Sequence, residues 1–189
     1  GKMAIYLNLT DHADYVIPML DKVIAHNDRH LDIIRNRVLA LSLQDIVNDE
    51  LTPLISLKEG IQSRLKELDS TRGWFYSFFS ISDIDMSQAL KHIEDLIQQA
   101  PLTSKIELIK SALEEQVVTS QNDPKLNMID HIIMTIMPGD INDDEVLELE
   151  ELRRLLSSRL EALSQGGGAA GAVDMTQALD HLSSLVQRG

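Results

Sequence analysis

Metal coordination is the chemistry that the spacing of polar residues suggests first. His26 and His30 are four residues apart, like two zinc ligands on one helix face, but we expect the Asn-Asp pair between them to break the helix. The acidic stretch 140–151 carries oxygen-bearing side chains at positions one, three, five, nine and twelve of an EF-hand-like loop. Its sixth position is Glu145, where that loop needs glycine. We therefore expect no metal site, and a calcium- or zinc-responsive switch stays an alternative.

The residue types of catalytic sites are present, but not in a catalytic pattern. No Ser-His-Asp arrangement, carboxylate pair or nucleotide motif can be assembled, and there is no cysteine to act as a thiolate nucleophile. The glycine-rich run 166–171 lacks the Lys-Ser/Thr ending of a phosphate-binding loop and has the composition of a linker, natural or engineered. His92 and His181 occupy matching positions of a repeat, which indicates a shared packing role. The sequence predicts no enzyme and no cofactor.

Aromatic side chains gather in one segment. Five of the chain's seven aromatic residues fall within six consecutive positions: Trp74, Phe75, Tyr76, Phe78 and Phe79. Such a segment either folds back over the ends of its own helices or docks into a partner, where Trp, Tyr and Phe are typical anchors. Insertion into a membrane interface, as the tip of a helical hairpin, is a further alternative. We predict these five residues as partner-binding residues.

Composition and charge narrow the classes of partner. Hydrophobic residues make up 43% of the 189 residues and charged residues 25%, as in globular rather than disordered proteins. The formal net charge of −13 repels phosphate groups, so it argues against nucleic acid, disfavours membrane contact and favours a basic protein or one presenting an amphipathic helix. No stretch approaches the ~20 apolar residues of a membrane span. We expect a cytoplasmic protein, although the absence of cysteine fits a secreted or periplasmic one equally well.

An internal repeat organises these features. When the chain is shifted by 95 positions, residues 22–68 align with 117–163 at 15 identities in 47 positions. The match resumes at 84–100 and 173–189, where eight of 17 positions are identical after the second copy is shortened by six residues. Amphipathic helices share their leucines by default, but not the matching Asp, Gln and His at polar positions. We therefore predict a tandem duplication of a unit of about 95 residues.

Hydrophobic periodicity predicts four helices in each copy and little or no sheet. The expected helices of the first copy are 11–26, 29–43, 50–68 and 85–99. Those of the second copy are 103–120, 124–137, 145–163 and 174–188. Capping residues are expected before the second helix of each copy, at Asn27-Asp28 and Asn122-Asp123, and before the third, at Asp49 and Asp144. Pro124 suits a first helical turn, and Glu150 with Arg154 forms an i,i+4 pair.

The sequence thus predicts an all-α protein with one helical unit at 9–100 and another at 101–189, as two adjacent bundles or a short helical-repeat array. The predicted function is that of a non-enzymatic protein–protein interaction module, an adaptor, regulator or scaffold. A partner would bind in a helical groove, on the aromatic segment, or on both.

Overall fold

The computed structural model describes residues 8–47, 51–70, 82–114, 117–165 and 170–187, and every regular element within these ranges is a helix. This confirms the prediction of an all-α protein. The chain divides into two compact units, residues 1–99 and 100–189, called here the first and the second unit. No helix of the described ranges is long and apolar enough to cross a membrane.

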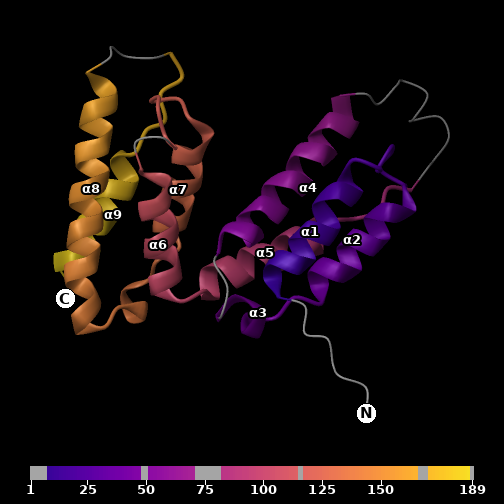
Figure 1. Cartoon of the computed structure of the whole chain (residues 1–189), viewed down its shortest axis with the longest axis horizontal. Helices are drawn as coiled ribbons and strands as arrows, with labels where there is room; N and C mark the ends of the chain where they lie inside the picture. Colours follow the sequence, from indigo (N-terminus) through magenta and orange to yellow (C-terminus); the bar gives the residue numbers. More distant parts are fainter. Residues whose placement is uncertain (1–7, 48–50, 71–81, 115–116, 166–169, 188–189) are drawn as a thin grey trace. The chain divides into compact units, whose positions relative to one another are not determined.

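The first unit is built around four long helices in its described part (Figure 1). The helices are α1 (Leu9–Leu20), α2 (Arg29–Leu39), the short α3 (Leu43–Val47), α4 (Thr52–Ser70) and α5 (Ser87–Gln99). Helix α4 packs on α1 and α5, and α2 packs on the same two helices. The core is apolar, with Leu31, Leu54, Ile61 and Ile93 among its fully buried side chains.

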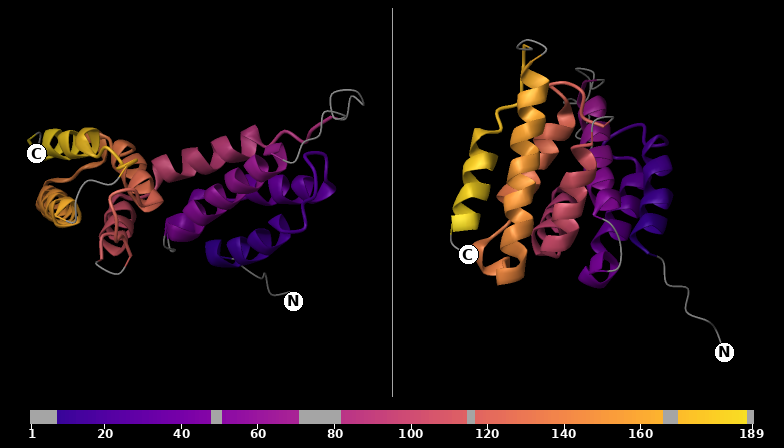
Figure 2. Two further views of the ribbon diagram at one scale, coloured as in Figure 1. Left: turned by 90° about the horizontal axis from the view of Figure 1, so that it is seen from above. Right: turned by 60° about the vertical axis from the view of Figure 1, so that its left-hand side comes forward.

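The second unit has the same order of long helices in its described part (Figure 2). These are α6 (Leu102–Ala112), α7 (Pro124–Met134), α8 (Val146–Ser164) and α9 (Thr176–Gln187), with two 3-10 turns, η2 (Pro138–Asp140) and η3 (Asp143–Glu145), between α7 and α8. Helix α9 packs on α7 and α8, and α6 packs on the same two helices. Helix α8 buries only a narrow stripe of three leucines, Leu149, Leu152 and Leu156.

The second helix of each unit begins where the sequence predicted. Asp28 accepts a hydrogen bond from the backbone amide of His30 at 2.9 Å, and Asp123 accepts one from the amide of Lys125 at 2.9 Å. Pro124 occupies the first turn of α7. These aspartates satisfy amides that have no partner within the helix, which fixes where α2 and α7 start.

The first helix of each unit is shorter than predicted. Helix α1 ends at Leu20 rather than at residue 26, and α6 ends at Ala112 rather than at residue 120. The connectors that follow turn inward and bury Val23 and Val118 completely. The free energy gained by burying these valines is therefore larger than that of extending the helices, although the connectors have a helical pattern of apolar residues.

The second helices are also shorter than predicted, and one predicted cap is wrong. Helix α2 ends at residue 39 rather than 43, and α7 ends at residue 134 rather than 137. Asp144 does not cap α8: it lies inside η3, where the Glu145 side chain accepts a hydrogen bond from the Asn142 amide at 3.0 Å. The acidic run therefore closes a 3-10 turn on itself before α8 starts. Asp49, the other predicted cap, lies outside the described residues.

An arginine ties the first connector of each unit to its longest helix. The guanidinium of Arg64 in α4 donates to the carbonyl oxygen of Val23, with its Nε at 3.1 Å. Nη2 of Arg159 in α8 donates to the carbonyl oxygen of Val118 at 2.6 Å. Each arginine thus satisfies a carbonyl beside a buried valine, where the helix has just ended.

The histidines at matching positions have the same contact. Nε2 of His92 in α5 donates to the carbonyl oxygen of Leu41 at 2.7 Å, and Nε2 of His181 in α9 donates to that of Ile136 at 2.7 Å. Each ring therefore anchors the last helix of its unit to the chain that follows the second helix. A backbone hydrogen bond adds to this in both units, from the Ile84 amide to the His26 carbonyl and from the Val173 amide to the Gln121 carbonyl.

Candidate binding groove between α8 and α9

The predicted partner-binding residues lie outside the described residues. Trp74, Phe75, Tyr76, Phe78 and Phe79 all fall within 71–81, so their role as anchors stays a prediction. Of the glycine-rich run 166–171, the structure describes the last two residues, and Gly171 has a φ of 79° that favours glycine.

The two histidines with zinc-ligand spacing face different carboxylates. His26 Nε2 lies 2.8 Å from an oxygen of Asp69, whereas His30 Nδ1 lies 2.7 Å from Asp28. Asn27 and Asp28, which lie between them, are not helical, as predicted. In the part of the chain that the structure describes, no group of three or more His, Asp or Glu side chains could hold a metal ion.

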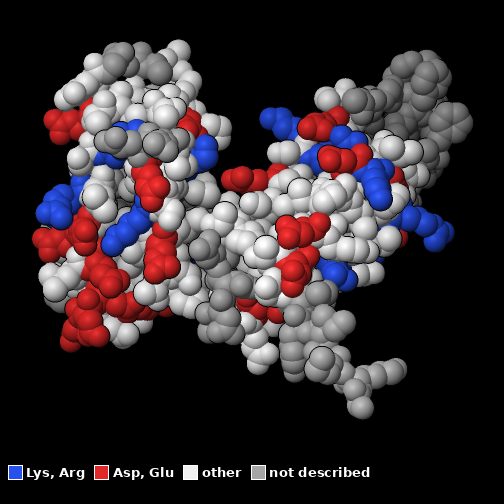
Figure 3. Space-filling view, in the orientation of Figure 1, with Lys and Arg blue, Asp and Glu red and all other residues white. Residues whose placement is uncertain are grey.

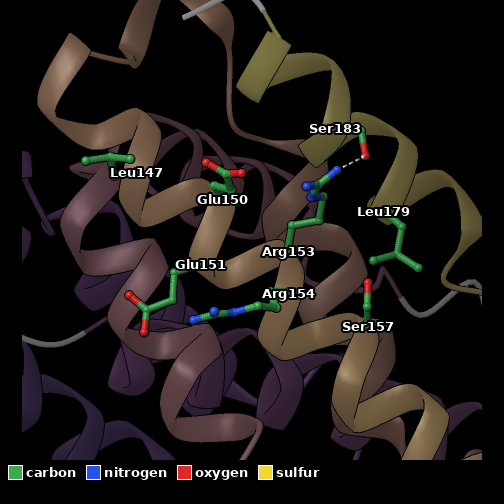
Figure 4. A pocket seen from close by; sticks show the side chains of 8 residues that line it. All are labelled: Leu147, Glu150, Glu151, Arg153, Arg154, Ser157, Leu179 and Ser183. Atoms are coloured by element: carbon green, nitrogen blue, oxygen red, sulfur yellow. Dashed lines mark hydrogen bonds between the residues drawn. The ribbon is translucent and has the colours of Figure 1, made fainter.

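A recess of the second unit lies along the groove between α8 and α9, and it has a volume of about 540 Å³ (Figure 4). Its lining combines two leucines, two arginines, two serines and two glutamates: Leu147, Leu179, Arg153, Arg154, Ser157, Ser183, Glu150 and Glu151. Helix α9 supplies Leu179 and Ser183, and α8 supplies the rest. Leu147 is 73% exposed, so the groove offers an apolar contact that the unit itself does not cover.

Opposite charges follow one another along the α8 side of the groove. Nη1 of Arg153 points across to α9 and donates to the Ser183 hydroxyl at 3.4 Å, while Arg154 points away from Ser183, toward Glu151 (Figure 4). Within the described ranges, no carboxylate lies within ion-pair distance of either arginine. The predicted pair of Arg154 with Glu150 is therefore absent, and Glu151, which also lines the groove, lies 3.9 Å from Lys110 of α6.

The matching position of the first unit contains an ion pair. The repeat register places Lys58 of α4 where Arg153 lies in α8, and Glu94 of α5 where Ser183 lies in α9. Lys58 Nζ contacts the Glu94 carboxylate directly, and the Lys58 side chain is only 17% exposed. Burial lowers the pKa of Lys58, an effect that the nearby Glu59 opposes. In the first unit the carboxylate of Glu94 thus neutralises the charge of Lys58, whereas in the second unit the hydroxyl of Ser183 occupies the position that matches the carboxylate.

A second recess, of about 380 Å³, lies between α6 and α8. Leu113, which directly follows α6, and Leu155 of α8 line it, and Leu155 is 39% exposed. In the first unit the register matches Leu155 with Gly60, which lies where α4 passes α1. A Cβ atom on Gly60 would lie 3.1 Å from Leu20 Cδ1, so a larger side chain there would require the Leu20 side chain to move by a few tenths of an ångström.

Acidic side chains gather at one end of the groove. Figure 3 shows Asp and Glu around the start of α8, where Asp143 and Asp144 of η3 and Glu148 and Glu151 of α8 are exposed. The arginines of the groove are therefore local cations on an acidic surface.

Sequence reasoning did not single out Arg153 and Ser183. The alignment of the two segments contained the signal, because Lys58 and Glu94, an acid–base pair, align with Arg153 and Ser183. Identical residues indicated the alignment, whereas this signal lies at two positions where the aligned residues differ.

Comparison with protein-family models, with curated proteins and with solved structures finds no match to the chain.

Proposed function

We propose that the chain is a non-enzymatic protein-interaction module whose second unit binds an amphipathic helix of a partner in the groove between α8 and α9. The observation that carries the proposal is the groove itself: a recess of about 540 Å³ with leucines toward both ends and separated charges between them. Grooves between helices bind amphipathic helices through apolar anchors, and polar groups set the register.

The distribution of perturbed ionisable groups supports binding rather than catalysis. Hydrogen bonds from Ser87 and Thr176 lower the pKa values of Asp85 and Asp174, which precede α5 and α9. Burial lowers the pKa of Lys105, a side chain that is 1% exposed. None of these groups lines the groove. They serve helix ends and packing, whereas catalytic sites gather such groups in one cleft.

We further propose that the two units descend from one four-helix unit by tandem duplication. The matched sequence positions support this, as do the equivalent arginine–carbonyl and histidine–carbonyl hydrogen bonds in the two units. Under this proposal, function diverged where the copies differ: at the groove of the second unit and at the aromatic segment of the first.

Selection from a displayed library of amphipathic helical peptides tests the groove. We expect enriched peptides to shift the backbone amide resonances of α8 and α9, and to lose binding when Leu179→Arg fills the recess with a bulky cation. A surface variant away from the groove, Ile24→Arg, serves as the control because Ile24 is 80% exposed in the first unit. If enriched peptides bind the Leu179→Arg variant as tightly as the wild type, the groove is not the docking site.

The aromatic segment is a second contact under the same proposal, since Trp and Phe are frequent anchors of interfaces. The double variant Trp74→Ala, Phe75→Ala is expected to weaken binding of peptides that contact residues 71–81, and to leave binding to the α8–α9 groove unchanged. Binding of wild-type protein to anionic lipid vesicles, lost in the double variant, would instead assign the segment to a membrane.

A further inference from the structure

The two units differ in how they complete one cross-helix contact. In the first unit, Lys58 of α4 meets the carboxylate of Glu94 on α5. In the second, Arg153 of α8 reaches, among the residues that the structure describes, only the hydroxyl of Ser183 on α9, at 3.4 Å. A hydroxyl is a weak partner for a guanidinium, which binds a carboxylate through two parallel hydrogen bonds.

The space beside Arg153 is available to a ligand. A serine side chain is shorter than a glutamate, and the recess of about 540 Å³ extends along the same face of α8. The hydroxyls of Ser157 and Ser183 border it, and Arg154 adds a second cation one residue away (Figure 4). The recess therefore supplies hydrogen-bond donors where the first unit supplies its own carboxylate.

We infer that the groove recognises an acidic side chain of the partner helix, whose carboxylate binds Arg153 in the place that Glu94 takes in the first unit. This inference rests on the proposed function of the groove. Glu150 and Glu151 lie about one turn before the arginines on the same helix, so they repel a second acidic group and favour a basic one. The occupant is thus a helix with an acidic and a basic residue about one turn apart, and with an apolar residue against Leu179.

The test uses a small probe that carries only the inferred group. N-acetylglutamate N-methylamide is titrated against the full chain at constant ionic strength, and N-acetylglutamine N-methylamide is the neutral control. The readout is the side-chain Nε–H resonance of Arg153 in nitrogen–proton NMR spectra. We expect a saturable shift with the glutamate probe and none with the glutamine probe.

A matched substitution supplies the carboxylate from the chain itself. Ser183→Glu gives the second unit an ion pair like the one in the first unit. Because the new carboxylate competes for Arg153, the variant should bind the glutamate probe about fivefold or more weakly than the wild type. It should also raise the thermal midpoint, whereas Ser183→Gln, which is of equal size, should not. Arg153→Gln should abolish the shift of neighbouring amides.

Three results of the probe experiments would overturn the inference. The first is an equal shift of the Arg153 resonance with the glutamate and the glutamine probe, and the second is an unchanged affinity of the Ser183→Glu variant for the glutamate probe. The third is saturation by inorganic phosphate at a much lower concentration than by the glutamate probe, which would make the groove a phosphate site. Library peptides that occupy the groove without any acidic residue would also overturn it while leaving the proposed function intact. Failure of every peptide to reach the groove would instead remove the proposed function.

Discussion

Replacing Asp28 by alanine should destabilise the first unit about twice as much as replacing Asp123 by alanine destabilises the second. Both aspartates cap the second helix of their unit, and both side chains are 11% exposed, so burial does not distinguish them. Their hydrogen bonds do. Asp123 accepts the Lys125 amide, whereas Asp28 accepts the His30 amide and, with its other oxygen at 3.0 Å, the Ile24 amide.

The magnitudes follow from these bonds. Loss of a capping side chain costs about 1 kcal/mol, which is the value expected for Asp123→Ala. Asp28→Ala also loses the hydrogen bond from the Ile24 amide. Because the acceptor of that bond is charged, its loss lowers the free energy of unfolding by at least about 1 kcal/mol more. The imidazole of His30, 2.7 Å from Asp28, loses its partner as well. The expected losses are therefore about 2 kcal/mol for Asp28→Ala and about 1 kcal/mol for Asp123→Ala.

The pH dependence gives an independent check. Burial raises the pKa of Asp28, but hydrogen bonds from the His30 and Ile24 amides and from the His30 ring outweigh it, so the net pKa is lowered. A carboxyl whose pKa is lower in the folded state stabilises that state fully above its unfolded pKa of about 3.9, and the stabilisation disappears as the pH falls through the folded value. The difference between wild type and Asp28→Ala should therefore be larger at pH 7 than at pH 3.

Urea titrations followed by backbone amide resonances report the two units separately, because residues of α2 and α7 are resolved individually. Wild type and both variants are compared at pH 7 and pH 3. A loss for Asp123→Ala as large as that for Asp28→Ala would refute the reasoning. So would an Asp28→Ala difference that is the same at both pH values.

Three other predictions concern the interior of the units. Burial lowers the pKa of Lys105, so the free energy of unfolding of the wild type should rise as the pH increases from the folded pKa toward the unfolded pKa. Lys105→Met should remove that rise and increase the free energy of unfolding by about 1–2 kcal/mol at pH 7, as measured by urea titration. Ile93→Ala should cost about 2–4 kcal/mol, against less than about 0.5 kcal/mol for Ile24→Ala, since Ile93 is fully buried and Ile24 is 80% exposed. His92→Ala and His181→Ala should each lower the free energy of unfolding by about 1 kcal/mol, as measured by the same titration. A negligible change in one unit would show that the hydrogen bond from the imidazole to the carbonyl does not stabilise that unit.

Sequence patterns predicted the parts of the fold that depend on local chemistry. Asp28 and Asp123 cap helices because a short acidic side chain can reach the first free amides, and Pro124 begins a helix because it has no amide to satisfy. The ends of α1 and α6 were not predicted, because they depend on the burial of Val23 and Val118 against distant helices. A local pattern contains no information about that packing.

The candidate groove could be predicted only in part. Its leucines and charges belong to the periodic pattern of α8, but whether a charge is paired depends on which helix lies opposite. The pair predicted within α8, Glu150 with Arg154, does not form, and the contact that matters crosses from Arg153 to Ser183, 30 residues away in sequence. The aromatic residues 74–79 lie outside the described ranges, so their prediction is tested only by the variants proposed above.

Gly60 and Leu155 occupy one register of the two aligned segments, on the side where the third long helix of each unit packs on the first. A Cβ atom at Gly60 would lie 3.1 Å from Leu20 Cδ1, so α4 and α1 lie close together there. Leu155 is 39% exposed and instead lines a recess of about 380 Å³ between α6 and α8. A substitution at either position would alter the surface of its unit without removing a helix cap or a ring–carbonyl hydrogen bond, so this register can vary independently of the contacts that hold the helices together.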